Sequence, residues 1–461
     1  MAGEVFTTRY WSRHAGVNNT LPDESIADDE FSDLANYQPD RSGNGWLIKR
    51  EGITRESSNV TAQVYSVFNG RNANYFHAGT VIRNFAGTSL DTGRAAAADT
   101  WTSFGTYDIF VNGTDARKTS DGAAFSAVSN IPSGTKYIAA VNNFLYGAGH
   151  DKGKLRWANI GTAETWPTTN ELVLTQDEND DIVIIAPTTN ALLVLCSKSH
   201  QMVTGFSNLE QEVSYYSKVE GCTASRSVAV TPFGVFWFSK AGVVWLKDGY
   251  QLDYPMLRKL STTLGALNRG QDANIHAVWD SSQNRVMFFL FNGAAQTTVN
   301  LRADFYPEFD AWYLHTGAGV QMAASGSALV SGVSNVYVGG YAASTYLYKV
   351  SGNDDDTVAI SAFAETKREA YGSSQMLKKC RKVVLTTNYG TTATTTYAQY
   401  IDNATATDTT WTHTSLGTGR VDTVMGCNRL HYKLKHRVAD AAATRTKIWG
   451  LHHEGYVVRG R

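Results

Sequence analysis

The sequence predicts an all-β protein, with a seven-bladed β-propeller-like body and a C-terminal antiparallel β-sandwich-like domain. Charged residues make up 18% of the 461 residues and aromatic residues 11%, with 40 Gly and 8 Pro, a balance that favours a folded, turn-rich chain over a disordered one. Short apolar runs followed by Gly turns recur along residues 46–352. A Thr-rich alternating pattern replaces them after residue 352.

The clearest repeat unit runs from Thr231 to Pro255, where three short apolar strands are separated by turns at Ser239–Gly242 and Asp248–Gly249. Runs of Val and aromatic residues with Gly between them are typical of a tight antiparallel meander. Such a meander cannot bury both of its faces alone, so a repeated array is expected. Similar units begin at Val64, Tyr107, Asn143, Ala191, Val235, Arg285 and Asn335.

The seven units are spaced by roughly 37 to 51 residues, which fits one four-stranded blade per repeat. Seven blades close into a ring, and closure removes exposed sheet edges. One helix is expected from Pro255 to Asn268, because its apolar residues fall on one face and Gly270 follows its end. Trp237 and Trp245 of the fifth unit are then expected to pack between blades.

The chain divides into three parts. Residues 1–45 carry an acidic stretch, Asp23 to Glu30, and few strand signals, so an extended N-terminal arm is predicted there, packed on the body or on a partner subunit. The propeller is placed at residues 46–352. Residues 353–461 hold alternating strands with long polar loops, which indicate an antiparallel sandwich. The run Asp354–Asp356 is interpreted as a linker or turn, since the spacing of a calcium loop is missing.

Charge, cysteines and hydropathy exclude several classes of protein. The formal net charge of −1 argues against a nucleic-acid reader with a basic face and against a polybasic membrane binder. The cysteines lack C-x-x-C spacing, so buried free thiols are expected at Cys196, Cys222, Cys380 and Cys427. The longest apolar runs are too short to span a bilayer, and the N-terminus lacks a signal-peptide core. A soluble protein made in a reducing cytoplasm is expected.

Motifs for catalysis are missing from the sequence. It contains no G-x-S-x-G elbow, no G-x-x-x-x-G-K-[ST] loop and no H-E-x-x-H motif. Paired carboxylates would suit a glycosidase, but the acidic cluster Asp177, Glu178, Asp180 and Asp181 is interpreted as a solvated loop. His452 and His453 occupy adjacent strand positions, which point to opposite faces, and are expected at the surface. We therefore predict no enzyme, no cofactor, and no catalytic, cofactor-binding or metal-binding residue.

Basic residues gather in the C-terminal part. The richest segment is Lys378 to Lys382. A strand is predicted at residues 429–436, with one face formed by Arg429, His431, Lys433 and Lys435. Two interpretations stay open: the polar face of a half-buried strand, or a basic strip that faces an acidic partner or the DNA backbone.

Four stretches resemble a known family. They are Leu47-Ile48-Lys49-Arg50-Glu51-Gly52-Ile53, with Glu51 where Pro is expected, Gly221 to Val228 leading into Thr231 to Trp237, Ala277 to Phe289, and Ile448 to Tyr456 with the closing Arg459-Gly460-Arg461. Spread over most of the chain, they resemble the tail nozzle proteins of short-tailed bacteriophages, also described as tail tubular or packaged-DNA-stabilisation proteins. Each motif is a turn or core signal, so the resemblance carries a fold and a role without functional residues.

The resemblance implies a structural protein of a podovirus virion, located in the viral tail at the head–tail connector and assembled in the host cytoplasm. Such proteins combine a β-propeller with a sandwich-like appendage. They form a homohexameric ring below the portal and its adaptor, retain the packaged genome and surround the channel for DNA ejection. The implied partners are further copies of the chain, the adaptor, and the tail needle or tail fibres. Double-stranded DNA would pass without sequence-specific binding.

A hypothesis from a different class stays open. A propeller-type glycan-binding adhesin or polysaccharide-degrading enzyme would stack sugars on exposed aromatic rings. Its candidate rings are Trp101, Trp157, Trp166 and Trp312. Their exposure, and an activity screen against bacterial polysaccharides, distinguish this hypothesis from the structural one.

Overall fold

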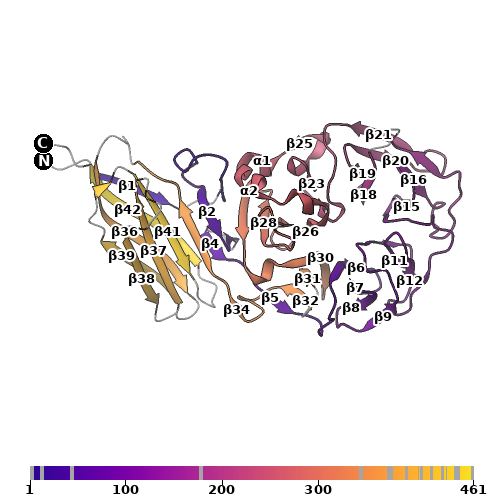
Figure 1. Cartoon of the computed structure of the whole chain (residues 1–461), viewed down its shortest axis with the longest axis horizontal. Coiled ribbons are helices and arrows are strands. Elements are labelled where there is room, and N and C mark those ends of the chain that lie inside the picture. Colours follow the sequence, from indigo (N-terminus) through magenta and orange to yellow (C-terminus); the bar gives the residue numbers. More distant parts are fainter. Residues whose placement is uncertain are drawn as a thin grey trace.

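A computed structural model describes most of the chain, namely residues 5–10, 15–41, 46–175, 180–341, 346–370, 377–389, 393–402, 404, 407, 409–415, 419–426, 430–431, 433–440 and 447–457. It confirms the predicted all-β fold. Seven sheets are arranged around a common centre, and two further sheets form a layered body at one side of this ring (Figure 1).

Six blades are four-stranded antiparallel meanders that follow one another along the chain. Blades 1 to 3 consist of β6 (Val64–Asn69), β7 (Asn74–Ala78), β8 (Val81–Asn84) and β9 (Ser89–Thr92); β10 (Thr100–Phe104), β11 (Tyr107–Val111), β12 (Ala116–Thr119) and β13 (Ser126–Ala127); and β14 (Tyr137–Val141), β15 (Phe144–Ala148), β16 (Lys154–Trp157) and β17 (Glu171–Val173). The predicted units all fall within these blades and the four described next.

Blades 4 to 6 continue the same pattern. They consist of β18 (Ile182–Pro187), β19 (Leu192–Cys196), β20 (His200–Thr204) and β21 (Glu212–Ser217); β22 (Ala229–Thr231), β23 (Gly234–Ser239), β24 (Gly242–Leu246) and β25 (Leu252–Asp253); and β26 (His276–Asp280), β27 (Arg285–Leu290), β28 (Leu301–Tyr306) and β29 (Ala311–His315). As predicted, tryptophans of blade 5 pack between blades: Trp237 lies 5.6 Å from the His200 ring of blade 4 and Trp245 5.8 Å from the Phe305 ring of blade 6.

Blade 7 closes the ring with a strand from the other end of the propeller. Its first three strands are β30 (Met322–Val330), β31 (Val333–Gly340) and β32 (Leu347–Val350), and its fourth is β5 (Ile53–Arg55), which precedes blade 1 in sequence. Gly52 permits this closure, because a Cβ there would lie 1.9 Å from the carbonyl oxygen of Asp354. The Asp354–Asp356 run, expected as a linker or turn, begins with the short strand β33 (Asp354–Asp355), which pairs with β5 and with β34 (Val358–Ala359).

The second body is a two-sheet sandwich. One sheet has the order β3 (Tyr37–Asp40), β4 (Trp46–Lys49), β42 (Lys447–Val457), β36 (Lys378–Tyr389) and β39 (Gly419–Gly426), joined by β1 (Val5–Tyr10) and β40 (Leu430–His431). The other has the order β2 (Phe31–Ala35), β35 (Ala362–Thr366), β41 (Leu434–Asp440), β37 (Ala393–Ile401) and β38 (Thr409–Ser415). Buried side chains from both sheets share one core.

The extended N-terminal arm predicted at residues 1–45 is wrong for its described part. Strand β1 pairs with β42, β2 pairs with β35, and β3 and β4 pair with each other and through β4 with β42. These strands are short, and the partners of β1 and β2, as well as the β42 partner of β4, lie hundreds of residues away, so a local pattern could not reveal them. The N-terminal segment therefore completes the C-terminal sandwich, and the propeller lies between the two halves of this body in sequence.

The sandwich packs directly against blade 6. The N-terminal segment covers the outer edge of β29: Val17 N donates to the Trp312 oxygen at 2.8 Å and Asn36 N to the Leu314 oxygen at 2.9 Å. All five residues of β29 are buried. A single apolar core then runs from blades 5 and 6 into both sheets of the sandwich.

The predicted helix is shorter and broken. It consists of α1 (Pro255–Lys259) and α2 (Ser261–Ala266), separated at Leu260, and is followed by the 3-10 turn η3 (Arg269–Asn274). Met256 and Leu260 are buried as expected, but Leu257 is 48% exposed. Further 3-10 turns are η1 (Ser225–Ser227), η2 (Asp248–Tyr250) and η4 (Ala318–Val320). No helix in the described part of the chain has the length and apolar character needed to cross a membrane.

The cysteines are of two kinds. Cys196 and Cys222 are buried free thiols, as predicted, and burial raises the pKa of each to about 12. Cys380 contradicts the prediction because it is disulfide-bonded. Its neighbours in space come from other strands of the sandwich, which the spacing of cysteines along the sequence does not report. Cys427 lies outside the described residues.

Candidate functional site

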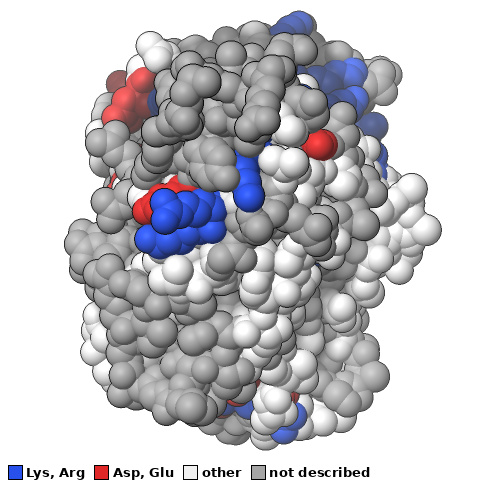
Figure 2. Space-filling model, turned by 90° about the vertical axis from the view of Figure 1, so that its left-hand side faces the viewer, with Lys and Arg blue, Asp and Glu red and all other residues white. Residues whose placement is uncertain are grey.

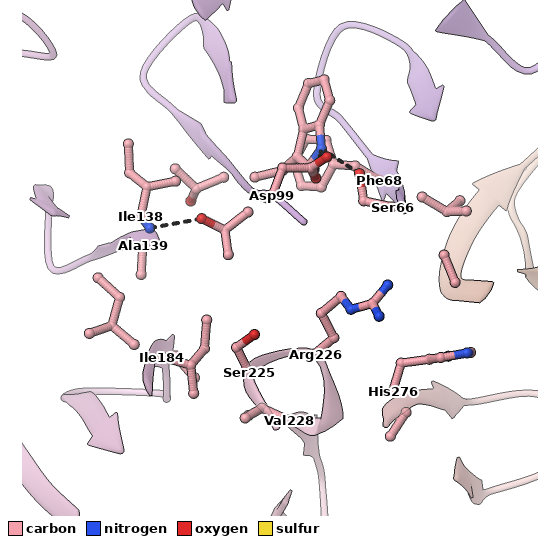
Figure 3. A pocket seen from close by; sticks show the side chains of 18 of the residues that line it. Ser66, Phe68, Asp99, Ile138, Ala139, Ile184, Ser225, Arg226, Val228 and His276 are labelled. Atoms are coloured by element: carbon pink, nitrogen blue, oxygen red, sulfur yellow. Dashed lines mark hydrogen bonds between the residues drawn. The ribbon is translucent and has the colours of Figure 1, made fainter. Parts of the chain in front are cut away.

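A cavity of about 310 Å³ lies at the centre of the propeller. It is lined by the first strand of each blade or the residues beside it, including Ser66, Trp101, Ile138, Ile184, Ser225, Arg226, His276 and Ser325 (Figure 3). The wall of the cavity therefore combines polar groups with apolar side chains. A volume of this size holds roughly ten water molecules at about 30 Å³ each, so the cavity suits a small molecule and is far too small for a DNA duplex.

Arg226 is the charged side chain that crosses this cavity. It belongs to the 3-10 turn η1 before blade 5, and its guanidinium points away from that turn toward the blades beyond (Figure 3). Its Nη1 donates to the carbonyl oxygens of Tyr65 at 3.3 Å and Ala323 at 2.9 Å, and its Nη2 to the oxygen of Asn274 at 3.2 Å. One side chain therefore links blade 5 to blades 1, 6 and 7, and burial lowers its pKa.

Replacement of Arg226 by Met should destabilise the propeller by about 1 to 3 kcal/mol, because three carbonyl oxygens lose their donor, two of them in partly buried contacts. Urea unfolding followed by tryptophan fluorescence measures the loss. Ser225→Ala changes the adjacent residue of the same cavity wall and is the matched control, with an expected change within about 0.5 kcal/mol. An equal loss in the two variants would contradict the role of Arg226 as a link between blades.

A second polar cluster lies where blades 1 and 2 meet. His77 Nδ1 and Asp99 Oδ2 are 2.5 Å apart with both side chains inaccessible to solvent, and Asp99 Oδ1 accepts from Trp101 Nε1 at 2.9 Å. Trp101 Nε1 also lies 2.9 Å from Ser66 Oγ. Although Ser, His and Asp occur together, no hydrogen bond joins Ser66 to His77 among the described contacts, so the serine lacks the base that nucleophilic catalysis needs.

Buried charges form a network between blade 6 and the N-terminal segment. Arg285 donates to Asp280 Oδ2 at 2.9 Å, Asp304 Oδ2 at 3.0 Å, Gln38 Oε1 at 2.8 Å and Glu51 Oε2 at 3.0 Å. Glu51, which replaces an expected Pro, thus has a partner. Asp304 also accepts a hydrogen bond at Oδ1 from Arg302 Nε at 2.9 Å, and its Oδ2 lies 3.1 Å from His315 Nε2.

Burial alone would raise the pKa of Asp304, but the charges of Arg302, His315 and Arg285 outweigh it and lower the pKa. Burial lowers the pKa of His315 to about 3 although Asp304 opposes the shift. Asp304, Arg302 and Arg285 are at most 1% exposed, and substrate cannot reach them. The network is a structural joint.

A second buried ion pair lies beside this network at the ring closure. The Arg50 guanidinium donates to both carboxylate oxygens of Asp355, at 2.8 and 2.5 Å, and its Nε donates to Asn36 Oδ1 at 2.9 Å. Gly319 N also donates to Asp355 at 2.9 Å. This carboxylate is fully engaged, so the Asp run cannot offer it to calcium. Among the described residues, no group of three or more His, Cys, Asp or Glu side chains is placed to hold a metal ion.

The acidic loop and the C-terminal histidines differ from expectation. Asp177 and Glu178 lie outside the described residues, and Asp181 is exposed as predicted. Asp180 is buried and accepts from Lys198 N and Ser199 Oγ at 2.7 and 2.6 Å, so it caps a turn.

His452 is partly exposed, but His453, predicted at the surface, is completely buried against His436 with ring centroids 5.2 Å apart. The prediction that His452 and His453 point to opposite faces of the strand is confirmed, but the face that carries His453 lies in the sandwich core.

The predicted basic strip is divided and largely neutralised. The strand expected at residues 429–436 is interrupted between β40 and β41, and its burial is reversed at the start, with Leu430 52% exposed and His431 buried. Lys433 and Lys435 form ion pairs of 2.5 and 2.9 Å with the acidic N-terminal stretch, at Glu24 and Asp23. Figure 2 shows a basic group on this end of the molecule that lies against carboxylates. Arg429 lies outside the described residues.

The four tryptophans proposed for sugar stacking do not form an exposed platform. Trp157 is 4%, Trp166 8% and Trp312 0% exposed. Trp101 is partly buried, stacked on Tyr75 and Phe68 at the blade junction. All four rings pack within or between blades, because large aromatic side chains are the residues that fill the wedge-shaped gaps of such an array.

Sequence inspection singled out the Gly221–Val228 run without assigning Arg226 a role. The signal was present, since this arginine is the single charge in a run of small and apolar residues between two blades. The carbonyl oxygens that it contacts come from Tyr65, Asn274 and Ala323, which no local pattern connects. The buried network around Arg285 was missed for the same reason.

Comparisons with known proteins assign no function to this chain. No known protein family matches this sequence, and no curated protein matches it. Among solved structures, the chain is similar to the Neurospora crassa Pan2 WD40 domain, with 7% identity, a TM-score of 0.43, and coverage of 66% of this chain and 96% of that one.

Two further similarities are of the same kind. One is to a chain in the S. cerevisiae complex of Dbp5 with Nup159 and Gle1, with 10% identity, a TM-score of 0.41, and coverage of 68% and 98%. The other is to the extracellular domain of a hybrid two-component system from B. thetaiotaomicron, with 9% identity, a TM-score of 0.45, and coverage of 66% and 40%. At these identities and scores, they add nothing to the assignment of a role.

Proposed function

We propose that this protein is a structural component of a phage tail, a nozzle that forms a ring below the portal and its adaptor. The observation that carries the proposal is where the family-like residues lie. Arg50 and Gly52 fix the ring closure, Arg226 links blades across the central cavity, and Asp280 anchors the buried network of blade 6. The sequence resemblance therefore concerns the residues that determine this propeller-and-sandwich architecture.

The propeller itself would not serve as the passage for DNA. Its central cavity measures about 310 Å³ and is crossed by Arg226. In the proposed nozzle, the genome passes through a wider opening that several copies surround, so the conduit is made of outer surfaces. A wall without a continuous basic field suits this role, because each phosphate contact would add affinity and slow transit.

Co-assembly with the adaptor tests the proposal. The purified chain is mixed with the adaptor protein encoded by the same genome and imaged by negative-stain electron microscopy. Rings of this protein docked on the adaptor are expected. Persistent monomers in the presence of assembled adaptor would overturn the proposed function. Depolymerisation of a bacterial polysaccharide by the purified protein would favour the alternative adhesin or enzyme instead.

A further inference from the structure

The outer strand of blade 4 differs from those of the other blades. Outer strands expose unpaired backbone groups, and proteins usually shorten or cover them. In blades 1, 2, 3 and 5 the outer strands have 4, 2, 3 and 2 residues, and in blade 7 the sheet continues beyond β5 with β33 and β34 of two residues each. The outer strand of blade 6 has 5 residues but is buried under the N-terminal segment. Strand β21 has 6 residues, and four of them are exposed.

The loop before β21 is rigidly held yet presents apolar side chains to solvent. Asn208 accepts from Trp157 Nε1 at 3.3 Å and from Ile160 N at 3.0 Å, and Gln211 Oε1 accepts from the Tyr146 hydroxyl at 2.7 Å. Leu209, between these anchors, is 91% exposed, and Phe206, just before them, is 76% exposed. We call the exposed apolar set Ile160, Phe206, Leu209 and Val213 the rim patch.

Exposed apolar clusters of this kind mark interaction sites. Because blade 3 already fixes the loop, binding would cost little ordering entropy.

A second apolar projection lies at the tip of the β30–β31 hairpin in blade 7. Leu329 is 55%, Val330 36% and Val333 58% exposed, and we call these three residues the hairpin patch. The two-residue turn between them has positive φ at Ser331 and Gly332, the geometry that a tight hairpin requires.

Blade 1 holds this tip in place. Leu329 N donates to Asn69 Oδ1 at 3.2 Å, and Asn74 Nδ2 donates to the Leu329 oxygen at 3.2 Å. The hairpin patch is therefore as firmly positioned as the rim patch.

The charges beside the two patches are complementary. Glu210 and Glu212 are exposed within the rim patch. Arg71 is exposed in the turn between Asn69 and Asn74, the two residues that hold the hairpin tip. An apolar surface flanked by carboxylates and an apolar tip held by a turn that carries Arg71, whose Nη1 donates to the Gly105 oxygen of blade 2, match both in hydrophobicity and in the sign of charge.

We propose that the rim patch of one copy binds the hairpin patch of a second copy of this chain. Blades 4 and 7 are separated by blades 5 and 6 on one side and by blades 1, 2 and 3 on the other, so one chain cannot pair its own patches. The contact joins two different surfaces, a head-to-tail geometry that generates a closed ring when the rotation closes. The inference deepens the proposed function, on which its biological setting rests, by naming the surfaces of the ring contact.

Sedimentation velocity with charge reversal tests the contact. Wild-type protein should self-associate. Leu209→Glu should raise the dissociation constant by about 30-fold, as loss of a central apolar anchor does. Glu212→Arg and Arg71→Glu should each weaken it by about tenfold, and combining the two reversals in one chain should restore association. Val358→Glu, at a residue 55% exposed on another blade edge, is the control and should change nothing. Monomeric wild-type protein, or failure of the double reversal to recover, would overturn the pairing.

Cross-linking tests its head-to-tail character. Under mild oxidation, a mixture of Leu209→Cys and Val330→Cys chains should form a disulfide-linked dimer, while either variant alone should not. Dimers of Leu209→Cys with itself would instead show a two-fold contact and overturn the proposal. If rings still form on the adaptor while Leu209→Glu assembles like wild type, the inference fails and the nozzle proposal stands. If the chain self-associates through the two patches but does not dock on the adaptor, the inference stands and the nozzle proposal fails.

Discussion

At pH 5.0 the free energy of unfolding is expected to be several kcal/mol smaller than at pH 7.5, because four histidines are buried in neutral form. Burial lowers the pKa of His276, His315 and His436 to about 3 and that of His453 to about 2. In the unfolded chain each would titrate near its usual value of about 6.5.

The sign follows from linkage. Since the folded pKa values are lowered, the stabilisation is fully present above about pH 6.5 and is lost as pH falls toward the folded pKa. At pH 5.0 each histidine accounts for a loss of about 2 kcal/mol, and four independent groups for about 8 kcal/mol. Asp272 changes the free energy of unfolding in the opposite direction, because burial raises its pKa to about 6. It offsets part of the loss that one histidine causes.

Urea unfolding at the two pH values measures the effect. His276→Gln should reduce the difference between pH 7.5 and 5.0 by about 2 kcal/mol even if it lowers stability at both. His452→Gln, at a partly exposed histidine of the sandwich, should leave the difference unchanged. A stability that stays flat between pH 7.5 and 5.0 would contradict the burial of neutral histidines.

Replacement of Arg285 by Met should cost about 3 to 5 kcal/mol, because it leaves buried carboxylates without their cation. Arg285 is 0% exposed and holds Asp280, Asp304 and Glu51 together. The penalty comes mainly from the stranded charges, since a desolvated carboxylate is far less stable than a hydrated one.

An exposed ion pair supplies the matched control. Arg258 lies 2.6 Å from Asp310, with side-chain exposures of 47% and 37%, and Arg258→Met should cost less than about 1 kcal/mol. Thermal unfolding of both variants beside wild type measures the contrast. Equal shifts in melting temperature would show that the Arg285 network is not a buried joint. Arg285→Lys should fall between, because it keeps the charge and loses the planar fork.

The propeller was predictable from sequence, and much of the sandwich was not. Each blade is a local meander, so runs such as Val235–Phe238 with a Gly turn report their own pairing. Strands β1, β2, β4 and β5 pair with residues about 300 or more positions away. Nothing near Ile53 or Phe31 indicates those partners. The acidic composition of residues 23–30 suggested exposure to solvent, whereas Asp23 and Glu24 form ion pairs with Lys435 and Lys433.

Buried polar residues were the hardest to place. His453 and Arg285 look like surface residues by type, and only tertiary pairing shows that they are enclosed. The central cavity was equally hidden, since its wall takes one or a few residues from each of seven blades. The tryptophans at 101, 157, 166 and 312 were candidates for sugar stacking on the condition that they are exposed, and tertiary packing among the blades removes that condition.

The pairing of β1 with β42 also sets the order of events during synthesis. Strand β42 lies between β4 and β36 in its sheet and is translated after all seven blades. The seven blades can close as soon as β32 meets β5, while the N-terminal strands still lack their sheet. The emerging chain must therefore carry an unfinished sandwich edge through the whole synthesis of the propeller, a long-range step of the kind that slows folding and favours chaperone protection.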